Sequence, residues 1–523
     1  MIKHKDWIII YAIFLIAFSI QFIVSLLINN WHFSYALDDP YIHLAMAKNL
    51  TENGIWGPTL YEFASTSSSP LYTLIISFFF LTGLKFTFIS LLVNLVSVAF
   101  LLFFINKIMI KKGFNNKTIV FISLLIVVFA PAVALTLTGM EHLLHSAFIL
   151  LLIYFSLEIV SKNQSNKFLF LFGLISLIAT SLRFETLFVV LAISIILLIK
   201  KKFKPLFMIV LGGVLPVIIL GLISILNSSY FLPNTLLTKG HYPVFTFPEL
   251  LGQASQWIII SFRHPHILSC FVLLSLNIIL PNKENRNLDN NWFTISIIGI
   301  VSLILHLTFA RIGWFYRYEA YLVVLSLFSI SPILNRMFEK NTGFVSVLKN
   351  NKLLVTILII SLIPLTHRLI SSVYKSSLAP KNIYEQQIKL AEFLNEYQYH
   401  SVVLNDIGAA CYYNNLQLVD MAGLANKEII EAIKSGEYNT SFITDFTSRK
   451  NSRIAVIHED IVDFKLPDNW KKAAYWKIKN NVVCYKDKIY FYSLKLSEHN
   501  RLLNNLKENS RRLPKDMKFK VLE

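Results

Sequence analysis

Residues 7–43 read WIIIYAIFLIAFSIQFIVSLLINNWHFSYALDDPYIH. The apolar run over 7–28 is long enough to cross a bilayer, which takes about 20 apolar residues in a helix. Its basic start and the lack of a small-residue cleavage site predict a retained span with a cytoplasmic N-terminus. Two adjacent carboxylates, Asp38 and Asp39, follow directly before Pro40. Carboxylates are costly beside hydrocarbon, so this stretch predicts both a membrane fold and a functional site.

The composition of the whole chain agrees with a membrane fold. Of 523 residues, 55% are hydrophobic and 15% charged, and the mean hydropathy is +0.56. Soluble proteins carry far more charge, so we expect a polytopic membrane protein of mainly α class. The net charge of +18 is typical of basic cytoplasmic loops that face anionic lipid. No nucleic-acid motif is present, and nucleic acid is not an expected partner.

Apolar segments recur along the first part of the chain and predict about 10–12 membrane segments. They lie at about 7–28, 70–84, 87–105, 118–137, 143–160, 167–181, 184–199, 206–226, 264–281, 292–310, 318–334 and 352–372. Three basic connections, 106–117, 161–167 and 200–204, are expected on the cytoplasmic face. For that arrangement, either 70–84 or 87–105 must fail to cross, and the pattern leaves open which one.

The chain divides by composition into two domains. Residues 1–375 form the predicted transmembrane domain, with a first extracytoplasmic loop at 29–69. Residues 376–523 form a predicted soluble extracytoplasmic α/β domain. There, NIYEQQIKLAEFLNEYQ has the pattern of an amphipathic helix, and SVVLND, RIAVIHED and VVCYKDKIYFYSL have the pattern of strands.

The loop 29–69 is expected to hold a short interfacial helix. It starts near Pro40, ends at Gly54 and has an apolar face turned to the lipid. Ser69 is a good cap for the next helix, and Pro70 suits its first turn.

Asp38 and Asp39 are assigned different roles. Asp followed by Pro is a good start for a helix, so Asp39 has a structural explanation. Asp38 has none, and we interpret it as the catalytic member of the pair.

Other polar side chains fall at the same predicted outer face. Positive charges there run against the usual loop bias and indicate a local partner, for which a phosphate is suited because Arg binds it bidentately. The expected donor-phosphate ligands are Arg183, Lys239, Arg311 and Arg317, and the expected substrate-binding residues are His43, Glu141, His145, Glu185, Asn234 and Tyr318.

A carboxylate beside a basic cluster at a membrane surface suits sugar transfer from a lipid-linked sugar phosphate. Arg and Lys would neutralise the phosphate leaving group, and an Asp would take the proton of the attacking acceptor hydroxyl.

Several segments, in their order along the chain, resemble bacterial GT-C membrane glycosyltransferases, in particular the group of AftB-type arabinofuranosyltransferases. They are LDDPYIHLAMAKNLTENGIWG, STSSSPLYT, TGMEHLLHSAF, LRFET, LPNTLLTKG, RYEAYLVVL and NDIGAACYYNNLQLVDMAGLANKEI. In LRFET, Phe184 and Thr186 stand where the family has Pro and Gly. The resemblance covers Asp38 to Asn426.

This resemblance implies an inverting glycosyltransferase that uses a polyprenyl-phosphate sugar, with a hydroxyl of an envelope glycan or glycolipid as acceptor. The implied setting is lipopolysaccharide or surface-polysaccharide synthesis at the bacterial inner membrane, with the site and the C-terminal domain outside. It places Asp38 and Asp39 at the catalytic centre, the first as base. No cofactor is required, although a divalent ion at Asp38, Asp39 and Glu141 is an alternative.

Three other functions are compatible with lipid-linked glycans. A flippase predicts charges deep within spans and related halves, which the pattern lacks. A glycan polymerase or ligase is not separated from a transferase by these motifs. An inactive scaffold is disfavoured by the intact Asp pair. In the C-terminal domain, Asp406, Gly408, Asp420 and Gly423 are interpreted as turn residues.

Overall fold

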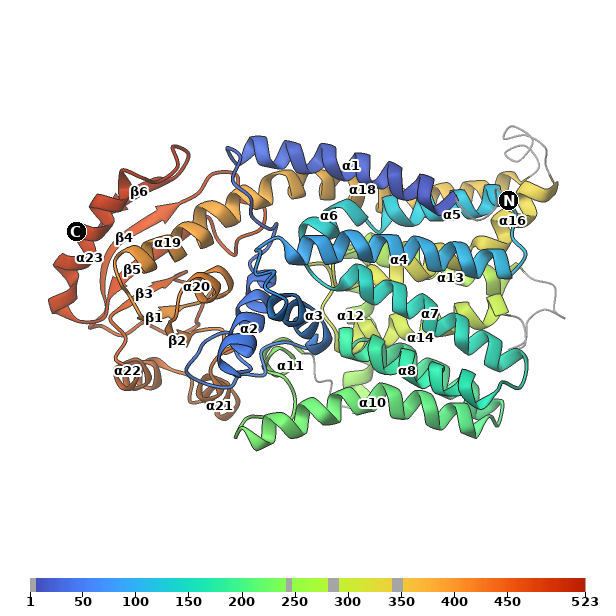
Figure 1. Cartoon of the computed structure of the whole chain (residues 1–523), viewed down its shortest axis with the longest axis horizontal. Helices are drawn as coiled ribbons and strands as arrows, with labels where there is room; N and C mark the ends of the chain where they lie inside the picture. The colour runs from blue at the N-terminus through green and yellow to red at the C-terminus, as the bar shows by residue number, and fades with distance from the viewer. Residues whose placement is uncertain (1–5, 241–246, 281–290, 341–350, 523) are drawn as a thin grey trace.

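The computed structural model describes residues 6–240, 247–280, 291–340 and 351–522. A long helical bundle is joined at one end to a smaller domain built on a six-stranded sheet (Figure 1). The expected mainly α membrane bundle with a small C-terminal α/β domain is confirmed.

Within the described ranges, seven helical stretches are long and apolar enough to cross a membrane. They are α1 (Asp6–Ile28), α4 (Ile89–Lys111), α7 (His142–Ser161), α10 (Phe203–Leu226), α14 (Asn291–Phe309), Ala320–Glu339 over α15 (Ala320–Ser329) and α16 (Ser331–Lys340), and the helix that starts with α18 (Lys352–Ile383). An eighth would be the pair α12 (Phe247–Arg263) and α13 (Pro265–Ile279), which is bent by 107°. Other expected segments form the shorter apolar helices α3 (Pro70–Leu81), α5 (Asn116–Phe129), α8 (Asn166–Leu182) and α9 (Thr186–Ile199).

The conflict between segments 70–84 and 87–105 is decided by helix length. Helix α3 has 12 residues, about 18 Å at 1.5 Å per residue, and hydrocarbon is about 30 Å thick. Helix α4 has 23 residues and is a candidate span. By length alone, segment 70–84 is therefore the one of the two that falls short of the hydrocarbon thickness. Segment 118–137 also divides, because the chain breaks at Pro131 between α5 and α6 (Ala132–Leu137).

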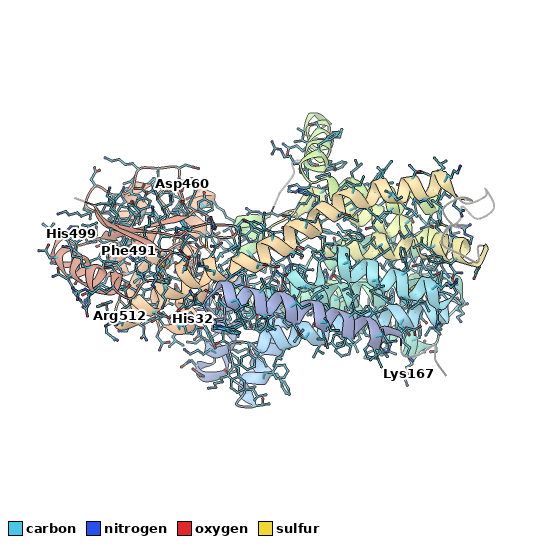
Figure 2. All side chains as sticks on the ribbon, turned by 90° about the horizontal axis from the view of Figure 1, so that it is seen from above. His32, Lys167, Asp460, Phe491, His499 and Arg512 are labelled. Carbon is cyan, nitrogen blue, oxygen red and sulfur yellow. The ribbon has the colours of Figure 1, made fainter. Side chains whose placement is uncertain are left out.

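The three basic connections meet at one end of the bundle. Lys112 Nζ lies 2.8 Å from Glu158 Oε1, and Lys204 Nζ donates to Asn166 Oδ1 at 2.7 Å. Figure 2 shows Lys167 at this end, while His32 lies at the opposite end beside the sheet domain. The grouping of basic connections on one face is thus present in the structure.

Helix α2 (Asp39–Asn53) forms in loop 29–69 and ends as expected at Gly54, which has φ +69°. Its apolar face does not lie on lipid, which corrects that prediction. Ala45 and Met46 are fully buried, because α2 packs between α3 and α20 (Gly408–Tyr413) of the sheet domain (Figure 1).

The sheet has the strand order β2-β1-β3-β5-β4-β6. Strands β2 and β3 run parallel to β1, and the remaining neighbours pair antiparallel. The bounds are β1 Ser401–Leu404, β2 Gln417–Asp420, β3 Ile454–Ile457, β4 Lys471–Lys477, β5 Lys488–Ser493 and β6 Lys518–Val521. The helices of this domain are α20, α21 (Lys427–Ser435), α22 (Thr440–Arg449) and α23 (Leu496–Ser510). Three strands arise from the expected segments, and β2, β4 and β6 were not expected.

The two domains are joined by continuous helix. Helix α18 runs through the π-helical turn η3 (Tyr384–Ile388) into α19 (Lys389–Glu396). The composition change at 375/376 lies inside this helix, because it marks where the helix leaves apolar surroundings rather than where it ends. A continuous helix therefore links the sheet domain to the bundle.

Candidate functional site

A cavity of about 430 Å³ lies where α2, the ends of α8 and α14 and the sheet domain meet. Leu424 of the sheet domain contributes to its wall. The expected site residues that line it are Asp39, His43, Glu141, Arg183, Glu185, Arg311, Arg317 and Tyr318. Side chains from distant parts of the sequence are thereby gathered around one space.

Asp39 forms an ion pair with Arg317 in this cavity. Arg317 Nη2 donates to Asp39 Oδ2 at 3.1 Å, and the Asp39 side chain is 29% exposed while that of Arg317 is 2% exposed. Arg317 Nε also donates to the carbonyl of Trp314 at 3.3 Å. The guanidinium is held in place, and the carboxylate remains accessible to a molecule in the cavity.

The chain before Arg317 is a left-handed turn. Gly313, Trp314, Phe315 and Tyr316 all have positive φ, between 39° and 83°. Left-handed backbone costs roughly 1–2 kcal/mol for each non-glycine residue and persists where surrounding structure imposes it. Glu319 supplies that structure from below the turn, where it is fully buried.

Glu319 binds three separate elements. Its carboxylate accepts from Gly313 N at 2.9 Å and from Arg368 Nη2 of α18 at 2.9 Å, and it lies 3.1 Å from His266 Nε2 of α13. Although burial acts in the opposite direction, Arg368 and His266 lower the pKa of Glu319. The ionised carboxylate thus fixes the turn that positions Arg317.

A second ion cluster also lines the cavity. Glu141 Oε1 accepts from Ser69 Oγ at 2.7 Å and from Arg183 Nη1 at 2.5 Å. Arg183 also forms a bidentate ion pair with Glu185, in which Nε donates to Oε2 at 3.1 Å and Nη2 donates to Oε1. Burial raises the pKa of Glu185, but Arg183 outweighs it and holds the pKa at about 2. Arg183 is therefore shared between two carboxylates.

Tyr318 connects the two ion clusters. The guanidinium carbon of Arg183 lies 5.6 Å from the centre of the Tyr318 ring, and that of Arg317 lies 5.3 Å from it. Both distances are within the range of cation–π attraction. The Tyr318 ring is therefore close enough to attract both guanidinium groups.

Asp38 has surroundings different from those expected. It occupies the cap position of α2 but makes no side-chain hydrogen bond to that helix. Its carboxylate instead accepts from Gly408 N at 2.6 Å and Ala409 N at 2.8 Å, at the start of α20. The cavity wall includes Asp39 and does not include Asp38. Asp38 rather than Asp39 thus occupies the cap position, and its side chain binds α20 while that of Asp39 pairs with Arg317.

Gly408 is required by close packing rather than by positive φ. A Cβ on Gly408 would lie 2.2 Å from the carbonyl oxygen of Asp38, which only glycine avoids. Gly423 does have positive φ, +75°, as the turn interpretation expected. Asp420 caps that turn through the backbone amides of Ala422 and Ala425.

Besides Asp38, three expected site residues do not line the cavity with described side chains. His145 Nε2 lies 2.9 Å from Thr186 Oγ1, behind the Arg183 cluster. Asn234 begins α11 (Asn234–Lys239) and donates through Nδ2 to the carbonyl of Leu424 at 2.9 Å. Asn234 therefore joins the sheet domain to the bundle. The side chain of Lys239 lies outside the described residues.

The sequence patterns missed residues that contribute backbone amides to the site and one, Ser69, whose side chain has a different partner from the one expected. Ser69 is at the start of α3 but makes no side-chain cap, since its hydroxyl serves Glu141. Gly408 and Ala409 contribute amides from 370 residues further along the chain. Such contacts leave no local pattern in the sequence.

The structure also bears on the metal alternative. Within the ranges the structure describes, no group of three His, Cys, Asp or Glu side chains has the arrangement of a metal site. Of the three carboxylates considered for an ion, that of Asp38 accepts hydrogen bonds from the start of α20.

Comparisons with known proteins place the fold. Residues 381–492 match a family model described as a domain of unknown function, DUF8728. No curated protein matches the chain. ArnT from Cupriavidus metallidurans bound to undecaprenyl phosphate is similar in structure, with a TM-score of 0.52 and 9% identity over 94% of this chain and 99% of that one.

A second similar structure is the Archaeoglobus fulgidus oligosaccharyltransferase in complex with Zn and sulfate. Its TM-score is 0.50 at 12% identity, over 90% of this chain and 73% of that chain. At these identities the likeness concerns the fold alone. The chain has a GT-C-type fold.

Proposed function

We propose that this protein is a membrane glycosyltransferase that moves a sugar from a polyprenyl-phosphate donor to a hydroxyl of an envelope glycan or glycolipid. The observation that carries the proposal is the cavity in which Asp39 and Arg317 lie together beside Arg311. The shared fold supports it, since one similar protein is an oligosaccharyltransferase and another was solved with undecaprenyl phosphate.

The cavity wall has the two surfaces that such a donor needs. Leu187, Phe188, Val217, Leu232 and Phe309 form an apolar part, and α9, α10 and α14, which carry most of them, are apolar helices. A polyprenyl chain would lie along this part. The charged part lies towards α2, where the phosphate and sugar would bind.

For the phosphate we assign Arg311 and Arg317 as the principal ligands. The side chain of Arg311 is exposed and contributes to the cavity wall. Arg183 is already shared by Glu141 and Glu185, so its proposed role is to organise those carboxylates. Lys239, at the end of α11, is kept as a further candidate for the phosphate.

The proposed reaction uses Asp39 as general base. The acceptor hydroxyl oxygen attacks the anomeric carbon and forms the new glycosidic bond, while its proton passes to Asp39. The bond from that carbon to the phosphate oxygen breaks, and its electron pair leaves with the lipid phosphate. The arginines stabilise this charge as it develops. A single displacement of this kind inverts the anomeric centre.

The setting proposed for the reaction is the outer face of a bacterial inner membrane, in synthesis of lipopolysaccharide or another surface polysaccharide. The basic connections meet at one end of the bundle, and the sheet domain, whose Leu424 lines the cavity, lies at the other end (Figure 2). Basic loops favour the cytoplasm. The cavity and the sheet domain would then lie outside.

The test compares Asp39→Asn with Asp38→Asn, using purified protein and a panel of undecaprenyl-phosphate sugars. We expect Asp39→Asn to lower transfer roughly 10²–10⁴-fold, the contribution of a positioned base, while binding of undecaprenyl phosphate is kept. Asp38→Asn should keep measurable transfer. Full activity of Asp39→Asn would overturn the assignment of the base, and a wild-type protein that binds no polyprenyl phosphate would overturn the function.

A further inference from the structure

We propose that His43 and Glu141 form a subsite for one hydroxyl of the donor's sugar, and that this subsite selects a hydroxyl over an ammonium group. The inference rests on the proposed function and deepens it, because it names a chemical property of the transferred sugar. Both side chains line the cavity that holds Asp39.

The two carboxylate oxygens of Glu141 differ in their hydrogen bonding. Oε1 accepts from Ser69 and Arg183. Oε2 is buried and has no hydrogen-bond partner within the described part of the chain. Buried polar atoms almost always have a partner, and an orphaned one requires an explanation. A ligand group in the cavity would satisfy it.

His43 faces that oxygen from α2. Its Nδ1 lies 2.7 Å from Thr73 Oγ1, and its Nε2 lies 3.9 Å from Glu141 Oε2. Burial lowers the pKa of His43, against the opposing effect of Glu141, which favours the neutral ring. A lone pair on Nε2 would be repelled by the Glu141 carboxylate, whereas an N–H there would be attracted to it, so we assign the ring proton to Nε2, with the Thr73 hydroxyl donating to Nδ1.

One small polar group placed between these two atoms would bind both of them. A separation of 3.9 Å is too long for a direct hydrogen bond, which ends near 3.2 Å. An oxygen about 2.8 Å from each atom would close the gap with an angle of about 90°. That oxygen must donate to Oε2 and accept from Nε2–H.

Hydroxyl and ammonium groups differ in this respect. A hydroxyl both donates and accepts, so it satisfies Glu141 and His43 together. An ammonium only donates, so it would leave the His43 N–H facing another donor. A site built to bind a hydroxyl rejects an analogue that lacks it, because the buried polar groups stay unpaired.

The subsite also lies at a suitable distance from the reacting centre. Asp39 and His43 are four residues apart on α2, so they share a face and lie about 6 Å apart along the helix axis. A single sugar ring therefore reaches from Asp39, at the anomeric carbon, to His43 and Glu141.

The experiment measures transfer from undecaprenyl-phosphate sugars that differ at one ring position, with hydroxyl, hydrogen or amino groups, for wild type and His43→Phe. For one ring position we expect wild type to prefer the hydroxyl donor at least tenfold over its deoxy and amino analogues. In His43→Phe this preference should fall below threefold, while the affinity for undecaprenyl phosphate alone stays within twofold. The matched control is His32→Phe, because His32 stacks on Tyr384 at 4.4 Å and lies outside the cavity wall.

The outcomes separate the two proposals. If wild type transfers sugar but His43→Phe keeps the full preference, or an amino donor is used as well as the hydroxyl donor at every position, the subsite is wrong and the proposed function stands. If wild type neither binds undecaprenyl phosphate nor transfers any sugar, both fall. Thermal melting of each variant in detergent checks that its fold is intact.

Discussion

At the scale of single residues, the site depends on the pairing of Asp39 with Arg317. Arg317 donates both to Asp39 and to the Trp314 carbonyl, and its flat side chain lies against Tyr318. These are contacts for which lysine, a compact charge on a flexible stem, is a poor substitute.

We expect Arg317→Lys to lower the transfer rate by about 10²–10³-fold, the range seen when one donor to a developing negative charge is lost. The measurement is single-turnover transfer at saturating donor. The control is Arg453→Lys, which removes a guanidinium that pairs with Glu498 at 3.6 Å on the sheet domain. Equal losses in both variants would contradict a specific role for Arg317.

A pH dependence belongs to the neighbouring residue, Asp38. Burial, aided by the charge of Asp406, raises the pKa of Asp38 from its ordinary value of 3.8 to about 7, against the two backbone amides that bind it. In the folded protein, Asp38 therefore holds its proton more tightly than in the unfolded chain. Its contribution to stability is complete below pH 4 and is lost as the pH rises through about 7.

The expected result is that wild type melts at a lower temperature at pH 8 than at pH 5, and that Asp38→Asn shows a smaller difference. Thermal melting in the same detergent at both values measures it. An unchanged difference in the variant would show that Asp38 does not titrate in this range.

At the scale of elements, the important contact is the one between α2 and α20. Asp38 receives two amides from the start of α20, and the next residue, Asp39, lines the cavity. A shift of α20 would therefore move Asp38 and, through the peptide bond between them, the proposed base Asp39.

We expect Gly408→Ala to lower transfer at least tenfold, because the new methyl group would lie 2.2 Å from the backbone oxygen of Asp38 and must push the two helices apart. A displacement of about 1 Å at a reacting group can cost about 10²-fold. Donor affinity should change little.

The matched control for that variant is Gly252→Ala, where no atom lies within 4 Å of the added Cβ. Transfer rate and melting temperature are measured for both proteins. Wild-type transfer in Gly408→Ala would show that the docking of α20 does not position Asp39.

At the scale of the whole molecule, the basic connections lie at one end and the sheet domain at the other (Figure 2). We expect a membrane-impermeant thiol reagent to label Lys465→Cys from outside intact spheroplasts and Lys201→Cys only after lysis. The three native cysteines are buried and unpaired, so background labelling should be low. Labelling of Lys201→Cys in intact spheroplasts would reverse the proposed orientation.

The resemblance in sequence led to the fold class and to most of the residues around the cavity. Charges at the ends of apolar segments must lie at the membrane surface, so Arg183, Arg317 and Glu141 could be grouped without a structure. The sequence could not predict which of Asp38 and Asp39 lines the cavity, because two adjacent carboxylates before a proline have the same local pattern.

Hydropathy by itself thus determined that the chain is a membrane bundle with a polar end domain, since burial in lipid demands long apolar segments. Helix lengths, the packing of α2 and the partners of each charge were decided by tertiary structure alone. The physical reason is distance along the chain: the amides that bind Asp38 come from Gly408 and Ala409. Contacts of that kind depend on how the domains pack and leave no periodicity in the sequence.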